Sequence, residues 1–137
     1  MESRWAGAEL HRLATQELLA YSGEKEPRVR IDGQVVMLEP SMAQAAAITL
    51  HELATNAAKY GSLSAADGHV KISWSLTANG RLSLRWTESG GPPIITPPTH
   101  RGFGTRIMEN MIGQLKGEVR FEWRDEGLTC EIALPCS

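Results

Sequence analysis

Residues 51–60 of this chain read HELATNAAKY, a run that sets an acid, an amide and a cation at helical spacing. Glu52, Asn56 and Lys59 follow one another after four and three residues, so a helix stacks them along one side. A separate apolar side of the same helix, suited to packing on a sheet, comprises Met42, Ala46, Leu50, Leu53 and Ala57. The polar side must therefore line something other than the core.

The segments before this helix predict a helix and two strands. Apolar residues recur every three or four positions within 6–21, which is typical of an amphipathic helix. Strand-like runs at 28–31 and 35–38 flank Asp32-Gly33, a pair that favours a tight β-hairpin. Pro40 then opens the helix that carries the polar side.

The segments after this helix predict two further hairpins and a final helix. Strands are expected at 70–76, 82–86, 118–123 and 128–134, and a helix at 107–115 with Gly117 as its stop. Asn79-Gly80 joins the first strand pair, and a Gly/Pro-rich loop covers 89–104. The pattern predicts an α+β fold, a two-layer sandwich with helices on one face of a mixed, mainly antiparallel sheet.

The composition favours one domain that works by local recognition. The 137 residues include 14 basic and 16 acidic side chains, a formal net charge of -2, so no overall field attracts nucleic acid or anionic lipid. No apolar run approaches the roughly 18 residues of a membrane helix, and residues 1–4 lead into no signal peptide. We expect a cytoplasmic protein without membrane contact.

The polar side of the central helix suits a magnesium-bound polyphosphate. The Asn56 carbonyl oxygen is a hard ligand of the kind Mg²⁺ prefers when it bridges phosphates. Glu52, one turn earlier, can hold a metal-bound water or take a proton from an attacking group. The alternative is an ordinary helix with solvated polar residues, and Lys59 by itself favours that alternative.

The second pattern, Trp86-Thr87-Glu88-Ser89-Gly90, carries a strand into a loop with an acid at its exit. A carboxylate there can accept a hydrogen from the amino group of adenine, and Gly90 lets the backbone approach the base closely. An ordinary turn at the end of a strand gives the same pattern, and a tryptophan such as Trp86 is more typical of core packing than of a site.

The third pattern, Arg101-Gly102-Phe103-Gly104-Thr105, stands directly before the final helix. Glycines before a helix N-terminus expose N–H groups that bind phosphate, but a single glycine pair is a weak signal that an ordinary solvated loop also gives. The pattern matches neither the Walker motif nor the dinucleotide fingerprint, and the histidines and cysteines show no zinc spacing.

Taken in order, the three patterns resemble the GHKL ATPase superfamily across residues 28–135. His51 beside the asparagine motif, together with Trp86-Thr87-Glu88, resembles the signature of the HWE histidine kinases within it. The segment Trp5-Ala6-Gly7-Ala8 is similar to the one that leads into this domain in that family. The resemblance divides the chain into a leading segment and first helix, 1–27, and an ATP-binding core, 28–137.

The resemblance implies the Bergerat-type ATP-binding fold, with ATP and Mg²⁺ as ligands. The resemblance makes Glu52 the polar partner that activates or positions the reacting groups. It makes Asn56 the metal ligand and Lys59 a phosphate contact, so these three residues are the implied catalytic set. Glu88 reads adenine, Gly90 shapes the adenine pocket, and Gly102 and Gly104 hold phosphate. The implied nucleotide-binding set is His51, Asn56, Lys59, Tyr60, Glu88, Gly90, Arg101, Gly102, Phe103, Gly104 and Thr105.

The implied activity is transfer of the ATP γ-phosphate to a histidine on a dimerisation domain, for relay to an aspartate on a response regulator receiver domain. The expected acceptor motif is missing, since His11-Arg12 is followed by Ala14 and Thr15 where the family has lysine and asparagine. We therefore expect the chain to bind ATP but not to phosphorylate itself. Two alternatives stay open, an anti-sigma-factor serine kinase and a non-catalytic module that binds nucleotide or a partner.

The sequence also departs from common histidine kinase patterns at the adenine site. Glu88 stands where many members have aspartate, which is expected of the HWE group, and Pro92 stands where many have a second glycine. The lid between Gly91 and Arg101 is short and rich in proline, so its closure is expected to involve less movement.

Overall fold

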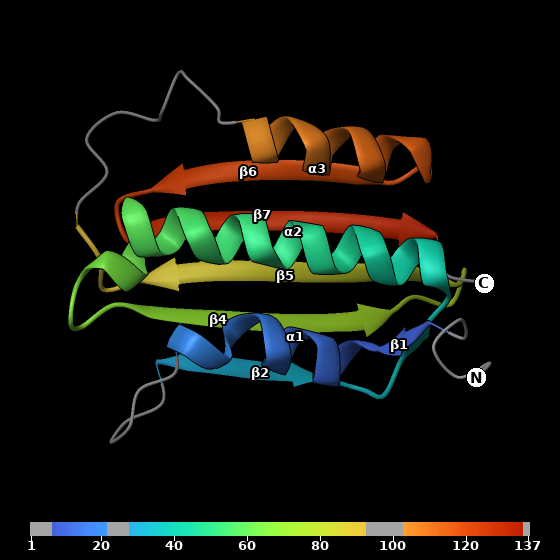
Figure 1. Ribbon diagram of the computed structural model, residues 1–137, viewed down its shortest axis with the longest axis horizontal. Coiled ribbons are helices and arrows are strands. Elements are labelled where there is room, and N and C mark those ends of the chain that lie inside the picture. The colour runs from blue at the N-terminus through green and yellow to red at the C-terminus, as the bar shows by residue number, and fades with distance from the viewer. Residues whose placement is uncertain (1–6, 22–27, 93–102, 136–137) are drawn as a thin grey trace.

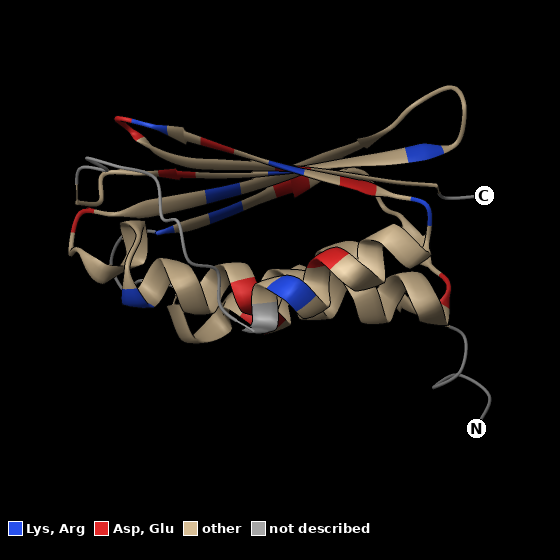
Figure 2. Cartoon of the chain, turned by 90° about the horizontal axis from the view of Figure 1, so that it is seen from above, with Lys and Arg blue, Asp and Glu red and all other residues tan. Residues whose placement is uncertain are grey.

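The computed structural model describes residues 7–21, 28–92 and 103–135. Within these ranges, three α-helices lie on one face of a five-stranded sheet, and no helix covers the other face (Figures 1 and 2). This confirms the predicted α+β two-layer arrangement.

The helices are α1 (Leu10–Leu18), α2 (Pro40–Lys59) and α3 (Phe103–Gln114), with 3-10 turns η2 (Leu19–Tyr21) and η3 (Ser62–Ser64). The strands are β1 (Ala8–Glu9), β2 (Val29–Gly33), β3 (Met37–Leu38), β4 (His69–Leu76), β5 (Arg81–Ser89), β6 (Glu118–Arg124) and β7 (Gly127–Pro135). The main sheet has the order β2-β4-β5-β7-β6, parallel only between β2 and β4, and β1 pairs with β3 in a separate ribbon. The sheet is therefore mixed and mainly antiparallel, as predicted.

Helix α2 lies across the middle of the sheet, between α1 and α3 (Figure 1). Pro40 occupies its first turn, where a missing N–H costs no hydrogen bond. The predicted apolar side is buried, with Leu50 0%, Leu53 2% and Ala57 1% exposed. Burial of this side fixes the rotation of α2 and so turns its polar side toward the neighbouring helices.

The predicted hairpins after α2 are confirmed. The β4–β5 turn contains Asn79-Gly80, and Gly80 has a positive φ of 78°. Strand β5 continues to Ser89, three residues past the predicted end, because Thr87, Glu88 and Ser89 still pair with β4. Glu88 therefore lies on a strand and not in a loop.

The predicted hairpin around Asp32-Gly33 is wrong. Residues 29–33 form β2, which pairs in parallel with β4, while Met37–Leu38 pairs with β1. A Cβ on Gly33 would come within 2.2 Å of the Trp74 ring, so the glycine makes room for an indole and does not form a turn. Glycine is common in tight turns and also where a backbone must make room for a ring, so the Asp-Gly pair did not by itself indicate a turn.

The bounds of α1 and α3 also differ from the predictions. Helix α1 begins at Leu10, with the Glu9 carboxylate accepting a bond from the His11 N–H at 2.7 Å, and residues 8–9 form β1 instead. Helix α3 begins at Phe103, four residues before the predicted start. Its stop is a Schellman motif, in which Lys116 takes the left-handed conformation (φ 63°) and the Gly117 N–H bonds the Ile112 carbonyl at 2.8 Å.

The buried core joins α1, α2, α3 and the helix-facing side of the sheet in one cluster. Cys130 is buried within it. None of the helices in the described ranges combines the length and apolarity needed to cross a membrane.

Candidate nucleotide-binding site

Glu52, Asn56 and Thr105 form a hydrogen-bonded cluster between α2 and α3. The Asn56 Nδ2 donates to Glu52 Oε2 at 2.9 Å, and the Thr105 Oγ1 donates to the same oxygen at 2.8 Å. Thr105 lies in the first turn of α3 and is 6% exposed, so the cluster ties the start of α3 to the middle of α2. The structure thus brings together three residues that the sequence placed in two separate motifs.

The chemistry of the cluster fixes which atom of Asn56 faces outward. A carboxylate oxygen only accepts hydrogen bonds, so the amide must present its NH₂ group to Glu52. The Asn56 Oδ1 is then the amide atom left for another partner. Glu52 acts on Asn56 as a clamp, and its own Oε1 makes no hydrogen bond among the described residues.

The Glu88 carboxylate is held from two sides. It is 5% exposed, and the Trp86 Nε1 donates to its Oε2 at 2.8 Å while the Ser62 backbone N–H donates to its Oε1 at 3.1 Å. Burial raises the pKa of Glu88, against the opposing effects of the Trp86 and Ser62 hydrogen bonds, which lower it. The site therefore holds a carboxyl group in a fixed place at the end of β5.

Two glycines allow close approaches near this carboxylate, Gly61 to the carboxylate itself and Gly90 to the backbone of Asp67. A Cβ on Gly61 would come within 2.3 Å of Glu88 Oε1, and one on Gly90 within 2.4 Å of the Asp67 carbonyl. Gly90 also has a positive φ of 74°, which favours glycine. Gly90 therefore lets the end of β5 pass closely by Asp67, a packing role that the sequence did not reveal.

Ser62 links the two parts of the site, because η3 directly follows the end of α2. Its side chain is buried beside Glu88, and its hydroxyl and its backbone N–H both contribute to lowering the pKa of that carboxyl group. Ser62 therefore connects the end of α2 to the Glu88 carboxylate.

His51 lies outside these two clusters. Its Nδ1 is 3.3 Å from Glu17 Oε1 on α1, and the His51 side chain is 73% exposed. It leaves α2 on the α1 side, whereas Glu52 leaves it on the α3 side. A contact between His51 and nucleotide stays a prediction.

Some of the remaining predicted site residues lie near the two clusters, and others lie outside the described residues. Lys59 ends α2 and is exposed, and Tyr60 follows as the C-cap residue with 77% exposure. Phe103 and Gly104 open α3, whose N-terminus therefore adjoins the Glu52 cluster. Arg101 and Gly102 lie outside the described residues, as does nearly all of the predicted lid.

Sequence reasoning missed the groups that hold Glu88. Trp86 and Glu88 are two residues apart on one strand and so share a face, a spacing that was available as a signal for the indole bond. The Ser62 contact comes from a backbone N–H, which no side-chain pattern records. Arg28 was also missed, although its guanidinium donates to the carbonyls of Leu63, Ala65 and Gly68 and so braces the segment after α2.

The side chains at this site do not form a complete coordination shell for Mg²⁺, which would also need oxygens from water and phosphate. No group of three or more His, Cys, Asp or Glu side chains suited to a metal occurs in the part of the chain that the structure describes. Mg²⁺ usually keeps several waters and binds protein through one or two oxygens together with phosphates. The Asn56 Oδ1, on the amide that Glu52 orients, would be one such oxygen.

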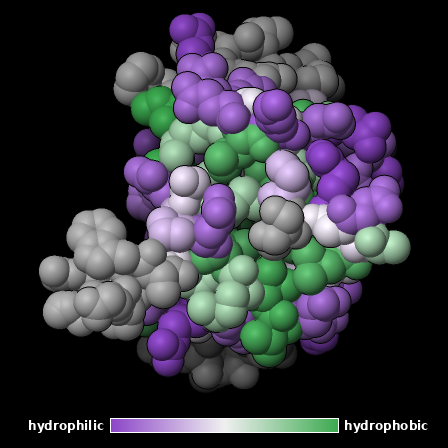
Figure 3. Space-filling view, turned by 90° about the vertical axis from the view of Figure 1, so that its right-hand side faces the viewer, coloured by the Kyte–Doolittle hydropathy of each residue, from purple (hydrophilic) through white to green (hydrophobic). Residues whose placement is uncertain are grey.

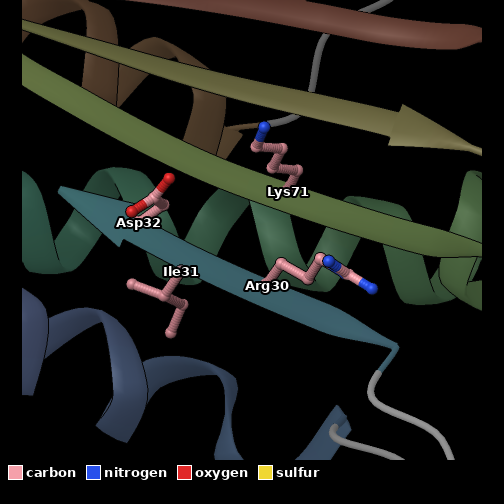
Figure 4. Close-up of a pocket in the computed structure, with 4 residues that line it drawn as sticks. All are labelled: Arg30, Ile31, Asp32 and Lys71. Atoms are coloured by element: carbon pink, nitrogen blue, oxygen red, sulfur yellow. The ribbon is translucent and has the colours of Figure 1, made fainter.

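A hollow lies on the uncovered face of the sheet (Figure 4). Arg30, Ile31, Asp32 and Lys71 line it, and Arg30 and Lys71 are partners across β2 and β4. Arg30, Asp32 and Lys71 are exposed. This hollow is separated from the Glu52 and Glu88 clusters by the sheet, so it takes no part in the site.

No family model matches the chain. It is 38% identical over 125 residues to blue-light-activated histidine kinase 1 of Erythrobacter litoralis, covering 90% of this chain and 34% of that protein. It is 37% identical over 135 residues to blue-light-activated histidine kinase of Rhizobium johnstonii, covering 96% of this chain and 37% of that one. The chain thus spans about a third of the length of these relatives.

Solved structures agree on the fold. The histidine kinase domain of the Erythrobacter litoralis EL346 protein superposes with a TM-score of 0.72 at 19% identity, covering 92% of this chain and 58% of that one. The catalytic domain of histidine kinase ThkA superposes with a TM-score of 0.63 at 19% identity, covering 93% and 94%. In sequence, the chain is therefore similar to about a third of the length of these histidine kinases, and it has the fold of the solved histidine kinase catalytic domains.

Proposed function

We propose that this chain is the ATP-binding catalytic domain of a two-component sensor histidine kinase. It would transfer the γ-phosphate of ATP to a histidine on a dimerisation domain, from which a response regulator aspartate receives it. The observation that carries this proposal is the Glu52 clamp, which leaves the Asn56 Oδ1 open beside the N-terminus of α3. An oxygen ligand next to free helix N–H groups suits a magnesium-bound triphosphate.

The α2–α3 side of the site would bind the triphosphate. Mg²⁺, when bound, neutralises charge on the phosphate oxygens during transfer. Asn56 would hold the metal through Oδ1, and Lys59 and Arg101 would add positive charge. Gly102, Phe103, Gly104 and Thr105 would bring the phosphates to the start of α3, where backbone N–H groups lack helical partners.

The β5 side would bind the base. Each carboxylate oxygen can accept more than one hydrogen bond, so Glu88 retains acceptor capacity beyond the bonds from Trp86 and Ser62. The exocyclic amino group of adenine is a donor and would use that capacity. Guanine carries a carbonyl at the same ring position, so the site would favour ATP over GTP.

The reaction would be a direct phosphoryl transfer. A ring nitrogen of the acceptor histidine forms a bond to the γ-phosphorus, the bond from that phosphorus to the ADP oxygen breaks, and the imidazole gives up a proton. Glu52 Oε2 already accepts from Asn56 and Thr105, so Oε1 would be the atom that takes or directs that proton. Glu52 would thus act as both clamp and base.

The partners follow from this reaction. The acceptor histidine would come from a dimerisation domain, since the chain matches only about a third of its relatives. The domain would work in the cytoplasm, where ATP and receiver domains are found. The relatives argue against a serine kinase, and they leave the binding-only module as an outcome that an experiment has to exclude.

A transfer assay tests the proposal. The chain is mixed with MgATP labelled at the γ-phosphate and with a separately supplied dimerisation domain that carries an acceptor histidine. We expect acid-labile label on that domain, no label when its acceptor histidine is replaced by glutamine, and strongly reduced label with Glu52→Ala. Saturable ATP binding without transfer in any of these mixtures would instead favour a module that only binds nucleotide.

A further inference from the structure

We propose that Trp86 is a positioning residue for base recognition, because its indole N–H holds the Glu88 carboxylate in the orientation that accepts the adenine amino group. This inference rests on the proposed ATP site. The inference gives Trp86 a role in base recognition in addition to core packing, which by itself would explain why the side chain is buried.

The position of Trp86 is rigid. It is 0% exposed on the middle strand β5, and its cross-strand partners are Ile72 on β4 and Cys130 on β7. An indole has a single polar atom, Nε1, and here that atom donates to Glu88 Oε2 at 2.8 Å. A fully packed ring thus presents one donor at a fixed point.

The second carboxylate oxygen is held independently. The Ser62 N–H donates to Glu88 Oε1 at 3.1 Å, and Gly61 leaves this oxygen its space, since a Cβ there would come within 2.3 Å. Donors on both oxygens fix the plane of the carboxylate as well as its position. Such preorganisation avoids the ordering cost that a freely rotating glutamate would meet on binding.

The indole N–H also acts on the charge of Glu88. Burial raises the pKa of this carboxyl group, and the Trp86 hydrogen bond is the largest of the effects that lower it. Without the indole N–H, a larger fraction of Glu88 would be protonated at a given pH. A protonated carboxyl group has less acceptor capacity than a carboxylate, and its O–H is a donor that faces the adenine donor unfavourably, so ATP affinity would fall first at low pH.

Trp74 provides a matched control. It is also buried, at 6% exposure, and its Nε1 also donates at 2.8 Å, to the Gln34 carbonyl at the other end of the sheet. Trp74→Phe and Trp86→Phe each remove a large ring and one indole bond. A merely structural role predicts similar effects from both, whereas a positioning role predicts an effect on ATP from Trp86→Phe alone.

The experiment measures binding of ATP and of inorganic tripolyphosphate by calorimetry over a pH series. A hydrogen bond to a charged group contributes about 1.5–3 kcal/mol, so Trp86→Phe should weaken ATP about 10- to 100-fold. It should leave tripolyphosphate nearly unchanged and move the low-pH loss of ATP affinity to higher pH. In a Glu88→Gln background, Trp86→Phe should add no further loss.

Several outcomes would overturn the inference. Equal effects of Trp86→Phe and Trp74→Phe, or an undiminished effect of Trp86→Phe in the Glu88→Gln background, would leave Trp86 as core packing only. If the wild-type chain bound no ATP, the proposed function itself would fail. If it bound ATP in a Glu88-dependent way while Trp86→Phe was normal, only this inference would fail.

A measurement on the wild-type chain covers the case in which Trp86→Phe does not fold. The Trp86 indole N–H resonance, assigned by triple-resonance NMR, should shift with pH as Glu88 titrates and again when ATP is added. Glu88→Gln should abolish the pH response. An indole resonance whose chemical shift does not change with pH, with ATP or with this substitution would contradict the inference.

Discussion

Glu52 uses one carboxylate oxygen to join two helices. Its Oε2 accepts from Asn56 and Thr105, which orients the Asn56 amide and anchors α3 on α2. Glu52 thereby couples the proposed metal ligand to the helix that would carry phosphate. The consequence is that variants of Asn56 and Glu52 should fail in different ways, the first in metal-dependent binding and the second in transfer.

Replacing Asn56 by alanine should remove the dependence of ATP binding on Mg²⁺. Asn56 is half-buried, and Glu52 Oε2 keeps its bond from Thr105, so the free energy of unfolding should fall by only about 1 kcal/mol. Urea unfolding and ATP titrations with and without Mg²⁺ measure the two effects. Asn110→Ala, at an exposed position on α3, is the matched control and should change neither.

Glu88 should make stability depend on pH. Its pKa is raised above 4.5 in the folded state, so the stabilisation from its bound proton is complete below 4.5 and is lost as pH rises through the folded pKa. Glu88→Gln cannot titrate. Across this window the free energy of unfolding of the variant should therefore improve relative to wild type, as followed by urea unfolding at successive pH values.

Glu131 should make the free energy of unfolding depend on pH in the opposite direction to Glu88. Hydrogen bonds from Arg85 and then Arg120 lower its pKa, so its contribution is present above 4.5 and is lost as pH falls through the lower folded value. Glu131→Gln should differ from wild type in pH dependence only on that acid side. Identical pH profiles for wild type and Glu88→Gln would contradict the account of a buried, titrating Glu88.

At the scale of elements, the segment between α2 and β4 depends on Arg28. Its guanidinium donates to the Gly68 carbonyl at 3.1 Å, to the Leu63 carbonyl at 3.3 Å and to the Ala65 carbonyl. This segment contains Ser62, whose N–H holds Glu88. Arg28 thus supports the segment whose backbone holds Glu88, where the base is proposed to bind.

Arg28→Met should destabilise the fold by roughly 1–3 kcal/mol, because the variant keeps the length of the side chain but leaves several carbonyls without their charged donor. Arg30→Met, two residues away and exposed, should change the free energy of unfolding by less than about 0.5 kcal/mol. Chemical denaturation of both variants makes the comparison. Equal losses would mean that the Arg28 bonds contribute nothing specific.

The elements also show where sequence patterns were sufficient. The apolar face of α2 and the Asn79-Gly80 turn were predictable, because each depends on residues close together in the chain. The Asp32-Gly33 hairpin failed because pairing with β4 and packing against Trp74 override the local turn preference. A local pattern cannot record a partner that lies forty residues further on.

The candidate site was likewise predictable from the sequence only where its contacts are local. Glu52 and Asn56 were predictable as neighbours on one helix, whereas the bond from Thr105 required the packing of α3 on α2. Glu88 was predicted as a base reader at the exit of a strand, but its burial and its two donors were not. Backbone donors and contacts between distant elements are the part that the sequence does not display.

On the scale of the whole molecule, the site lies toward one end of the helical layer. Lys59, Gly61 and Glu88 come together there because α2 and β5 both end at that side of the sheet (Figure 1). The opposite end, where α2 begins, carries a mixed polar and apolar surface (Figure 3). Val35 and Met37, 77% and 61% exposed, precede α2 in the chain, so this surface is separate from the candidate site.

Calorimetric titration with ATP, with and without Mg²⁺, tests the central claim most directly, with wild type, Asn56→Ala and Glu88→Ala compared side by side. We predict saturable binding by wild type, loss of the Mg²⁺ effect with Asn56→Ala, and a larger loss for ATP than for tripolyphosphate with Glu88→Ala. Failure of a demonstrably folded wild-type chain to bind ATP, or equal loss of both ligands with Glu88→Ala, would contradict the account.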